Sequence, residues 1–393
     1  MKGAKTYITD LIGIDLLRFA LSLIVVINHY YFFYFRFVDV NAGIIRSQPY
    51  FRFLFFFYKW GHCSVQVFWL ISGLIFQCIY YEAIILRDIA FREYVFLRFT
   101  RLYPLHFVTL VAVAIMQFFY FTEYGEFFMA QSEDLKHFAL QLLYMGSWYP
   151  HFNHSYNIPA WSVSLEIFVY LIFYILAVGG FIRNKGLHLV ILILIFFDIF
   201  DILDPFAECM TFFFCGCLLG RFITSGVPLR NLLSNYALLS LFALLIAGGG
   251  YFYLSGTNVH TRNLLIDVVL IAICSTLILL FILVFRDITS TWWIKFIKNL
   301  GNMTYSMYMI HFPIQLAIYL TLRPEDDSIF NQPATLLIFI ATSLIAGWLT
   351  FHYFEKPLQK YLRVKFSGSP HEAVVEGGKE AHTKIARGVE QKH

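Results

Sequence analysis

Residues 14–29 read IDLLRFALSLIVVINH, an apolar run that holds one arginine and one histidine. Arg18 and His29 are eleven residues apart, which is about 20° past three full helical turns, so both side chains lie on one face of a helix. At about 1.5 Å of rise per residue, roughly 16 Å separates them. A charged side chain within hydrocarbon costs about 3 kcal/mol or more and needs a partner, a ligand or water. The pair therefore predicts a polar pathway through a bilayer. The alternative is that Arg18 snorkels to the membrane surface and that His29 only bonds a neighbouring helix.

The composition is that of a polytopic membrane protein. Hydrophobic residues make up 59% of the chain and charged residues 14%. Several runs approach the ~20 apolar residues that span a bilayer as a helix. The basic residues fall between these runs, so the net charge of +4 does not indicate nucleic-acid binding. The first apolar run is too long for a signal-peptide core, and we expect it to be retained.

The hydrophobic runs predict an all-α protein with about ten membrane-spanning helices, which places both termini on one side. Lys and Arg are more frequent in the loops on the N-terminal side, so both termini are expected in the cytoplasm. Residues 1–366 would form one integral-membrane domain, and residues 367–393, rich in Gly, Glu, Lys and His, a disordered tail. The predicted spans are 14–35, 64–86, 104–121, 161–178, 187–203, 206–222, 235–254, 263–285, 303–320 and 334–353.

Two long loops are predicted on the outer side, at 36–63 and 122–160. The second contains a weakly apolar stretch, 137–145, that could re-enter the membrane. Its aromatic residues could contact carbohydrate, although an interfacial aromatic belt is the commoner reason for such residues. They are Trp148, Tyr149, Tyr156 and Trp161.

Glu166 is a second ionisable residue inside an apolar run. It ends the sequence WSVSLE (161–166) and lies about 9 Å into the fourth predicted span, a depth similar to that of His29. A carboxylate on one imidazole nitrogen fixes the tautomer and raises the basicity of the other nitrogen. We therefore expect Glu166 to hydrogen-bond His29 and to prepare it as a general base. A purely structural His–Glu pair is the alternative.

The sequence RFTRLYP (98–104) lies on a predicted cytoplasmic loop. Arg98 and Arg101 are three residues apart and could clamp a phosphate or pyrophosphate. Basic residues are also expected at any cytoplasmic helix end. Because Arg18 would open on the same side, a phosphorylated ligand that enters from the cytoplasm is the favoured interpretation.

Further polar or small residues lie at membrane depth. Ser72 and Gly73 are small enough to let helices approach closely. His311 is either a second titrating group or a packed core histidine. Asp198 and Asp201 could face a cavity, although Asp201 could equally lie near the outer interface. The six cysteines show no metal-binding spacing, and no metal site is predicted.

In this order, the motifs resemble membrane-bound acyltransferase family 3, whose members transfer acyl groups to cell-surface glycans. The resemblance runs from about residue 12 to 360. It rests on six elements: Arg18 with His29, GHCSVQVFWLISG (61–73), RFTRLYP (98–104), WSVSLE (161–166), LGNMTYSMYMIH (300–311) and FEKP (354–357). The family usually has an acidic residue where this chain has Gln66.

The resemblance implies an O-acyltransferase of the bacterial inner membrane. Acetyl-coenzyme A or another acyl-coenzyme A would be the cytoplasmic donor substrate, with no permanently bound cofactor. The acceptor would be a surface glycan or its lipid-linked precursor. His29, as general base or transient acyl carrier, and Glu166 would be catalytic. The donor would be held by Arg18, Arg98, Arg101 and Tyr103, and the cavity lined by Ser72, Trp161, Ser162, Tyr305, Ser306 and His311.

A transporter of glycans or lipids would use buried charges in the same way. Transporters often contain inverted repeats and helices broken at matching positions. The sequence shows no such repeat, which favours the enzyme.

Overall fold

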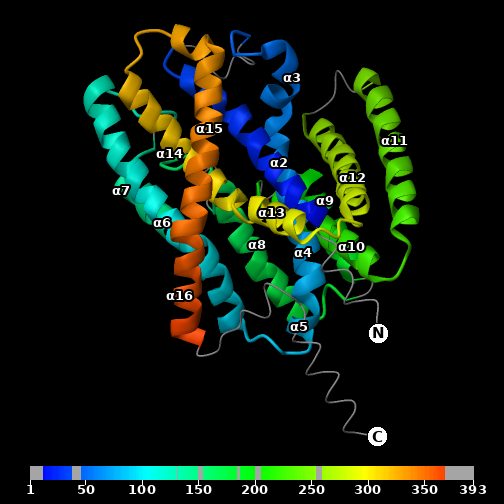
Figure 1. The fold of residues 1–393 in the computed structure, drawn as a ribbon. Helices are drawn as coiled ribbons and strands as arrows, with labels where there is room; N and C mark the ends of the chain where they lie inside the picture. Colours follow the sequence, from blue (N-terminus) through cyan, green and yellow to red (C-terminus); the bar gives the residue numbers. More distant parts are fainter. Residues whose placement is uncertain are drawn as a thin grey trace, which may run out of the picture.

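The computed structural model describes residues 12–37, 46–130, 132–148, 154–183, 186–199, 205–253 and 259–367. Within these ranges the chain forms helices and no strands (Figure 1), and it is an all-α polytopic membrane protein, as predicted. The α-helices are α2 (Ile12–Asn28), α3 (Phe51–Trp60), α4 (Ser64–Ile79), α5 (Tyr81–Ile85), α6 (Phe91–Tyr124), α7 (Leu135–Leu142), α8 (Ala160–Val178), α9 (Gly186–Ile199), α10 (Phe206–Thr224), α11 (Leu229–Tyr253), α12 (Val259–Phe285), α13 (Thr291–Asn302), α14 (Thr304–Leu322), α15 (Pro333–Thr350) and α16 (Lys356–Ser367).

Seven helical segments of the described chain are long and apolar enough to cross a bilayer. The other three predicted spans correspond to α9, α11 and α14. Helix α9 has only 14 residues, and part of α11 lies outside the residues whose side chains are described. Helix α14 is long enough, but it carries Ser306, His311 and Gln315, which make it more polar. A total of ten spans stays a prediction.

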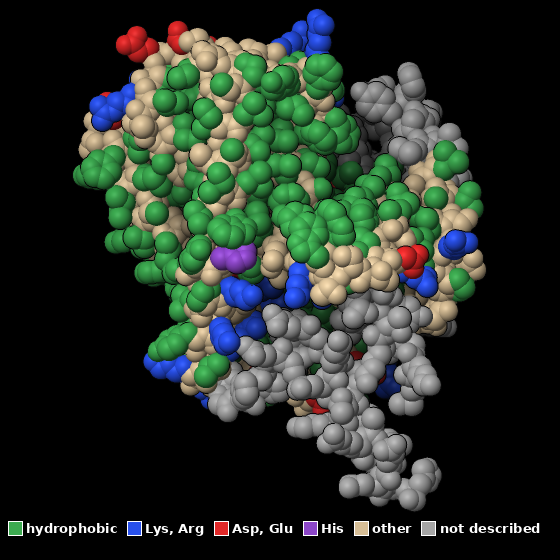
Figure 2. Space-filling view, in the orientation of Figure 1, with side chains coloured by type: hydrophobic (Ala, Val, Ile, Leu, Met, Phe, Trp, Pro, Cys, Tyr) green, Lys and Arg blue, Asp and Glu red, His purple; other side chains and the backbone are tan. Residues whose placement is uncertain are grey.

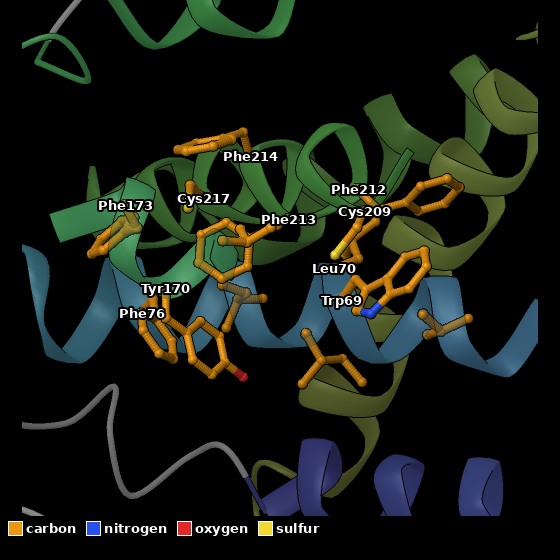
Figure 3. Close-up of a cluster of buried hydrophobic side chains, with 14 of the residues drawn as sticks. Trp69, Leu70, Phe76, Tyr170, Phe173, Cys209, Phe212, Phe213, Phe214 and Cys217 are labelled. Carbon is orange, nitrogen blue, oxygen red and sulfur yellow. The ribbon is translucent and has the colours of Figure 1, made fainter. Parts of the chain in front are cut away.

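Helix α2 packs between two hydrophobic clusters. One cluster joins it to α4, α8, α10 and α12, and the other joins it to α6, α14 and α15. Figure 3 shows the centre of the first cluster, where aromatic side chains of α4, α8 and α10 pack together. Phe76 stacks on Tyr170 with ring centroids 4.2 Å apart, and Phe213 packs edge-on to Phe76. The helix that carries Arg18 and His29 is therefore held from both sides.

Two glycines let α4 and α10 approach closely. A Cβ atom on Gly73 would lie 1.8 Å from the Phe213 carbonyl oxygen, and one on Gly216 would lie 2.0 Å from that of Leu70. These distances are far inside van der Waals contact, so neither site accepts a side chain without separation of the helices. The close approach expected at Gly73 is confirmed.

Replacing Gly73 with valine is expected to destabilise the protein by about 1–3 kcal/mol or more, because the added atoms overpack a closed helix crossing. Thermal unfolding of the purified protein in detergent measures the loss. Ala341→Val is the matched control, since Ala341 is exposed in the middle of α15 and accepts the same β-branched side chain without a clash. An equal melting temperature for Gly73→Val and wild type would contradict the close crossing.

The segment between α6 and α8, which holds the weakly apolar stretch 137–145, folds back against the bundle, and its re-entry into the membrane stays a prediction. Helix α7 and the turn after it lie against the middle of α6, where His106 Nε2 is 2.7 Å from the Gln141 carbonyl oxygen. Further along, the Tyr144 hydroxyl donates to the Leu102 carbonyl at 3.1 Å. Leu102 belongs to the RFTRLYP motif, so this segment reaches the end of the bundle that carries the motif arginines.

We call that end of the bundle the basic end. Helix α13 lies across the start of α2 (Figure 1), with Gly301 against Asp15. Figure 2 shows a broad hydrophobic surface above a group of Lys and Arg side chains. This is the distribution that the positive-inside rule expects on a cytoplasmic side. Exposed Trp292 and Trp293 on α13 are suited to a membrane interface.

Candidate active site

His29 lies where α2 changes into a 3-10 helix, His29–Tyr34. Two side chains fix the backbone at this change. Asn28 donates to the Tyr58 carbonyl at 2.9 Å, and Gln315 of α14 donates to the His29 carbonyl at 3.0 Å. Gly61 permits the first contact, because a Cβ atom there would lie 2.5 Å from that of Asn28. His29 is therefore anchored to two neighbouring segments.

The imidazole of His29 pairs with a second histidine. His29 Nδ1 lies 2.8 Å from His311 Nε2, and His311 Nδ1 lies 3.3 Å from the Met307 carbonyl oxygen. A carbonyl only accepts, so Nδ1 of neutral His311 carries the proton and its Nε2 is the acceptor. His29 must then donate from Nδ1, which leaves its Nε2 with a lone pair. Sequence reasoning had left the role of His311 open, and the structure makes it the direct partner of His29.

The direct hydrogen bond predicted between His29 and Glu166 is not formed. Glu166 accepts instead from Ser72 at 2.9 Å and from Tyr170 at 2.7 Å, so each carboxylate oxygen has a partner. Tyr170 is four residues after Glu166 on α8, a spacing that indicates a shared helix face. This partner could have been found from the sequence.

The reason for the error is the depth at which α8 begins. Asn157, just before the helix, donates to the Met309 carbonyl at 3.1 Å, and Ser162 is 2.8 Å from the Tyr308 hydroxyl. Helix α8 thus starts level with His311. Six further residues carry Glu166 about 9 Å past this level, toward the basic end. Glu166 is therefore a neighbour of Arg18, which acts on it electrostatically, and not of His29.

Arg18 faces several polar groups at the basic end. Its guanidinium lies 3.6 Å from the Asp15 carboxylate and 3.3 Å from the Thr304 hydroxyl. Asp15 precedes it by one helical turn and is itself covered by Gly301. The side chain of Arg18 is 16% exposed, so the charge is partly neutralised and largely shielded from solvent.

The two motif arginines differ in their surroundings. Arg98 lies over the rings of Tyr80 and Phe76, at 4.4 and 5.0 Å from their centroids, and donates to the Tyr80 hydroxyl. Arg101, in the part of the chain that the structure describes, has neither a hydrogen bond nor an ion pair. It nevertheless acts electrostatically on Asp15 and Glu166, which places it near Arg18. Of the pair, Arg101 is the one with a guanidinium available for a ligand.

Glu355 is a charged residue of this region that sequence reasoning missed. It ends a π-helical segment, Phe351–Glu355, between α15 and α16, and is 5% exposed. Its carboxylate accepts from Ser306 at 2.5 Å and is influenced by Arg101 and Arg18. The signal was present, because an acid within the FEKP sequence follows a long apolar run. Single-turn π-helical segments are frequent at functional sites.

The remaining predicted residues take structural positions around these groups. Tyr103 stacks on Phe99, with ring centroids 4.6 Å apart, rather than on a charged group. Tyr305 donates to the Leu102 carbonyl at 2.6 Å. Trp161 is partly buried against Trp69, with ring centroids 5.9 Å apart.

Gln66, where the family usually has an acid, donates to Glu208 of α10 at 2.9 Å. The carboxylate at this position is thus contributed by a neighbouring helix.

Of the aromatic residues considered for carbohydrate contact, Trp148 donates to the Ser164 carbonyl at 2.9 Å and Tyr156 is buried. Tyr149, Asp201 and the side chain of Asp198 lie outside the described residues.

Glu133 is a partly buried acid in the loop between α6 and α8. One of its oxygens accepts from the Tyr156 amide at 2.7 Å, the other is buried without a partner, and burial raises its pKa to about 8. Protonated Glu133 is therefore favoured in the folded loop. The folded loop is most stable below the ordinary pKa of 4.5, where Glu133 is protonated in both the folded and the unfolded loop. This contribution to the free energy of unfolding decreases as the pH rises and is lost as the pH passes through about 8.

We therefore expect hydrogen exchange of the described residues in 126–147 to become faster as the pH rises from 4.5 to about 8, after correction for intrinsic exchange rates. Glu133→Gln should remove this dependence, because the amide is neutral at every pH. Glu325→Gln, an exposed change in another loop, is the control. The same pH dependence in Glu133→Gln would show that another group is responsible.

The structure has a separate cavity of 180 Å³ between α5 and the end of α8. Arg87 and Arg183 lie at its lining together with apolar residues, and none of the predicted site residues contributes to it. Among the described residues, no group of three or more His, Cys, Asp or Glu side chains could hold a metal ion.

Comparison with known protein families matches residues 11–352 to acyltransferase family 3, described as an acyltransferase domain. The search of curated proteins and the search of solved structures each gave no match. The family match covers most of the chain and includes Arg18, His29, Arg101, Glu166 and His311. The protein therefore belongs to acyltransferase family 3 and is a membrane acyltransferase.

Proposed function

We propose that the protein transfers an acyl group, in the first instance acetyl, from cytoplasmic acyl-coenzyme A to a hydroxyl of a surface glycan or of its lipid-linked precursor. The observation that carries the proposal is the arrangement on α2. A histidine with an unprotonated Nε2 lies at one end of the helix, and a group of cationic side chains lies about 16 Å away at the other.

At the basic end, Arg18 and Arg101 would bind the phosphates of the donor. Charge-assisted bonds from guanidinium groups to phosphate are short and strong, and they fit the planar donor fork of arginine. Arg101 is suited to this task because its guanidinium has no other partner within the described residues. The thioester arm of the donor would then extend along α2 toward His29.

At the other end, His29 would act as the general base. Its Nε2 takes the proton of the acceptor hydroxyl, and the hydroxyl oxygen attacks the thioester carbonyl carbon. The carbon–sulfur bond breaks, and His29 returns the proton to the departing thiolate. The products are an O-acyl ester and free coenzyme A. The inner membrane of a bacterium is the expected location.

The test supplies acetyl-labelled acetyl-coenzyme A to membranes that contain the protein, followed by isolation of the glycan and of the lipid fraction. We expect label in an ester that mild base releases, and its absence when the membranes contain His29→Gln. The transporter alternative would be favoured by two results together. The label would stay with the donor in membranes with wild-type protein as well as with His29→Gln, and the protein would transport glycan across the membrane.

A further inference from the structure

The two paired histidines differ in access. His311 is 0% exposed, whereas His29 is only partly buried and stacks its ring on Phe32. Among the described residues, Nε2 of His29 has no hydrogen-bond partner, whereas both nitrogens of His311 are engaged. Of the two, His29 is therefore the ring that an acceptor can reach.

We propose that His311 is the positioning residue of the reaction, acting through His29 in the role that a carboxylate was expected to fill. This inference rests on the proposed function. The chain of bonds runs from His29 Nδ1–H to His311 Nε2, and from His311 Nδ1–H to the Met307 carbonyl. It selects the tautomer of His29 whose Nε2 is free to accept a proton.

A neutral partner suits this position in the membrane. A carboxylate next to His29 would have to be removed from water, at a large energetic cost unless it were fully bonded. His311 needs only one acceptor, and the Met307 carbonyl of its own helix supplies it. Hydrogen bonds in such a chain polarise one another, so the Met307 carbonyl supports the acceptor strength of His311 Nε2.

The proton count is consistent with this role. When His29 Nε2 takes the proton of the acceptor hydroxyl, His29 becomes an imidazolium with a proton on each nitrogen. The Nδ1 proton stays in the bond to His311, which stabilises the imidazolium while the carbon–oxygen bond forms. The Nε2 proton then passes to the departing sulfur, and both histidines return to their starting tautomers.

The variants that test this are His311→Leu and His311→Gln. Leucine removes the acceptor, so we expect the maximal rate of acetyl transfer from acetyl-coenzyme A to membrane glycan to fall by about 10- to 100-fold, with little change in KM for the donor. Glutamine keeps an oxygen acceptor and should recover part of the lost rate. His106→Leu is the matched control, because His106 is also a fully buried histidine, but its hydrogen bond goes to the Gln141 carbonyl and its ring stacks on Tyr144, away from His29 and His311. It should lower stability and leave the rate near that of wild type.

A spectroscopic measurement keeps the inference testable where a variant fails to fold. Nitrogen-15 spectra of histidine-labelled wild-type protein, with His29 assigned from His29→Gln, distinguish a proton on Nδ1 from one on Nε2. We expect His29 to carry it on Nδ1. A proton on Nε2, or a full rate in His311→Leu, would overturn the role of His311. His29→Gln would still be inactive in that case, so the proposed function would stand separately.

Discussion

Replacing His29 with glutamine is expected to abolish acyl transfer, with a rate at least 10²–10⁴-fold below that of wild type. Glutamine has a similar reach and can still donate to His311, so packing around α14 should be retained. It has no nitrogen with a basic lone pair and cannot take the acceptor proton. The loss would be larger still if His29 carries the acyl group covalently.

The measurement compares transfer of acetyl label with expression level and with coenzyme A binding. Both His29→Ala and His29→Gln should bind coenzyme A nearly as well as wild type, because the donor phosphates are held about 16 Å away. Near-normal acetylation by His29→Gln would make His29 a structural residue. Weak binding of coenzyme A by both variants would instead indicate that the bound donor already contacts His29 before the reaction begins.

The pattern on the first helix was predictable from sequence because it depends only on helical periodicity. Eleven residues place Arg18 and His29 on one face whatever the rest of the chain does. The partner of His29 was not predictable in the same way. It depends on where α8 begins, and Asn157 fixes that start beside the middle of α14 by a bond to the Met309 carbonyl. Hydropathy alone does not report such a depth.

The same distinction applies to the arginines and to the number of spans. Spacing treats Arg98 and Arg101 as equivalent candidates, but tertiary packing places aromatic rings around Arg98 and leaves Arg101 without a hydrogen-bond or ion-pair partner among the described residues. The polar residues of α14 lower the mean hydropathy of this helix. Mean hydropathy is the property from which a membrane span is recognised, so α14 is not among the seven segments. Prediction of spans from composition is therefore weakest for a helix that carries several polar side chains, such as α14.

The two arginines should consequently respond differently to substitution, although the motif alone suggested equal roles. Arg101→Gln is expected to weaken coenzyme A binding by roughly 10- to 100-fold, since a charge-assisted bond to phosphate contributes about 1.5–3 kcal/mol. The loss should shrink as salt concentration rises, because screening also weakens the wild-type interaction. Arg101→Lys, which keeps the charge but not the planar fork, should recover part of the affinity.

Arg98→Gln should act mainly on stability, because it removes the cation from the rings of Tyr80 and Phe76. Its melting temperature should fall, while its dissociation constant for coenzyme A should change less than that of Arg101→Gln. Isothermal titration of the purified protein gives the constants, with Arg286→Gln, an exposed arginine after α12, as the control for loss of one positive charge. Unchanged affinity in Arg101→Gln would show that the donor phosphates bind elsewhere. The Arg87–Arg183 cavity would then be the next site to test, because two guanidinium groups line it.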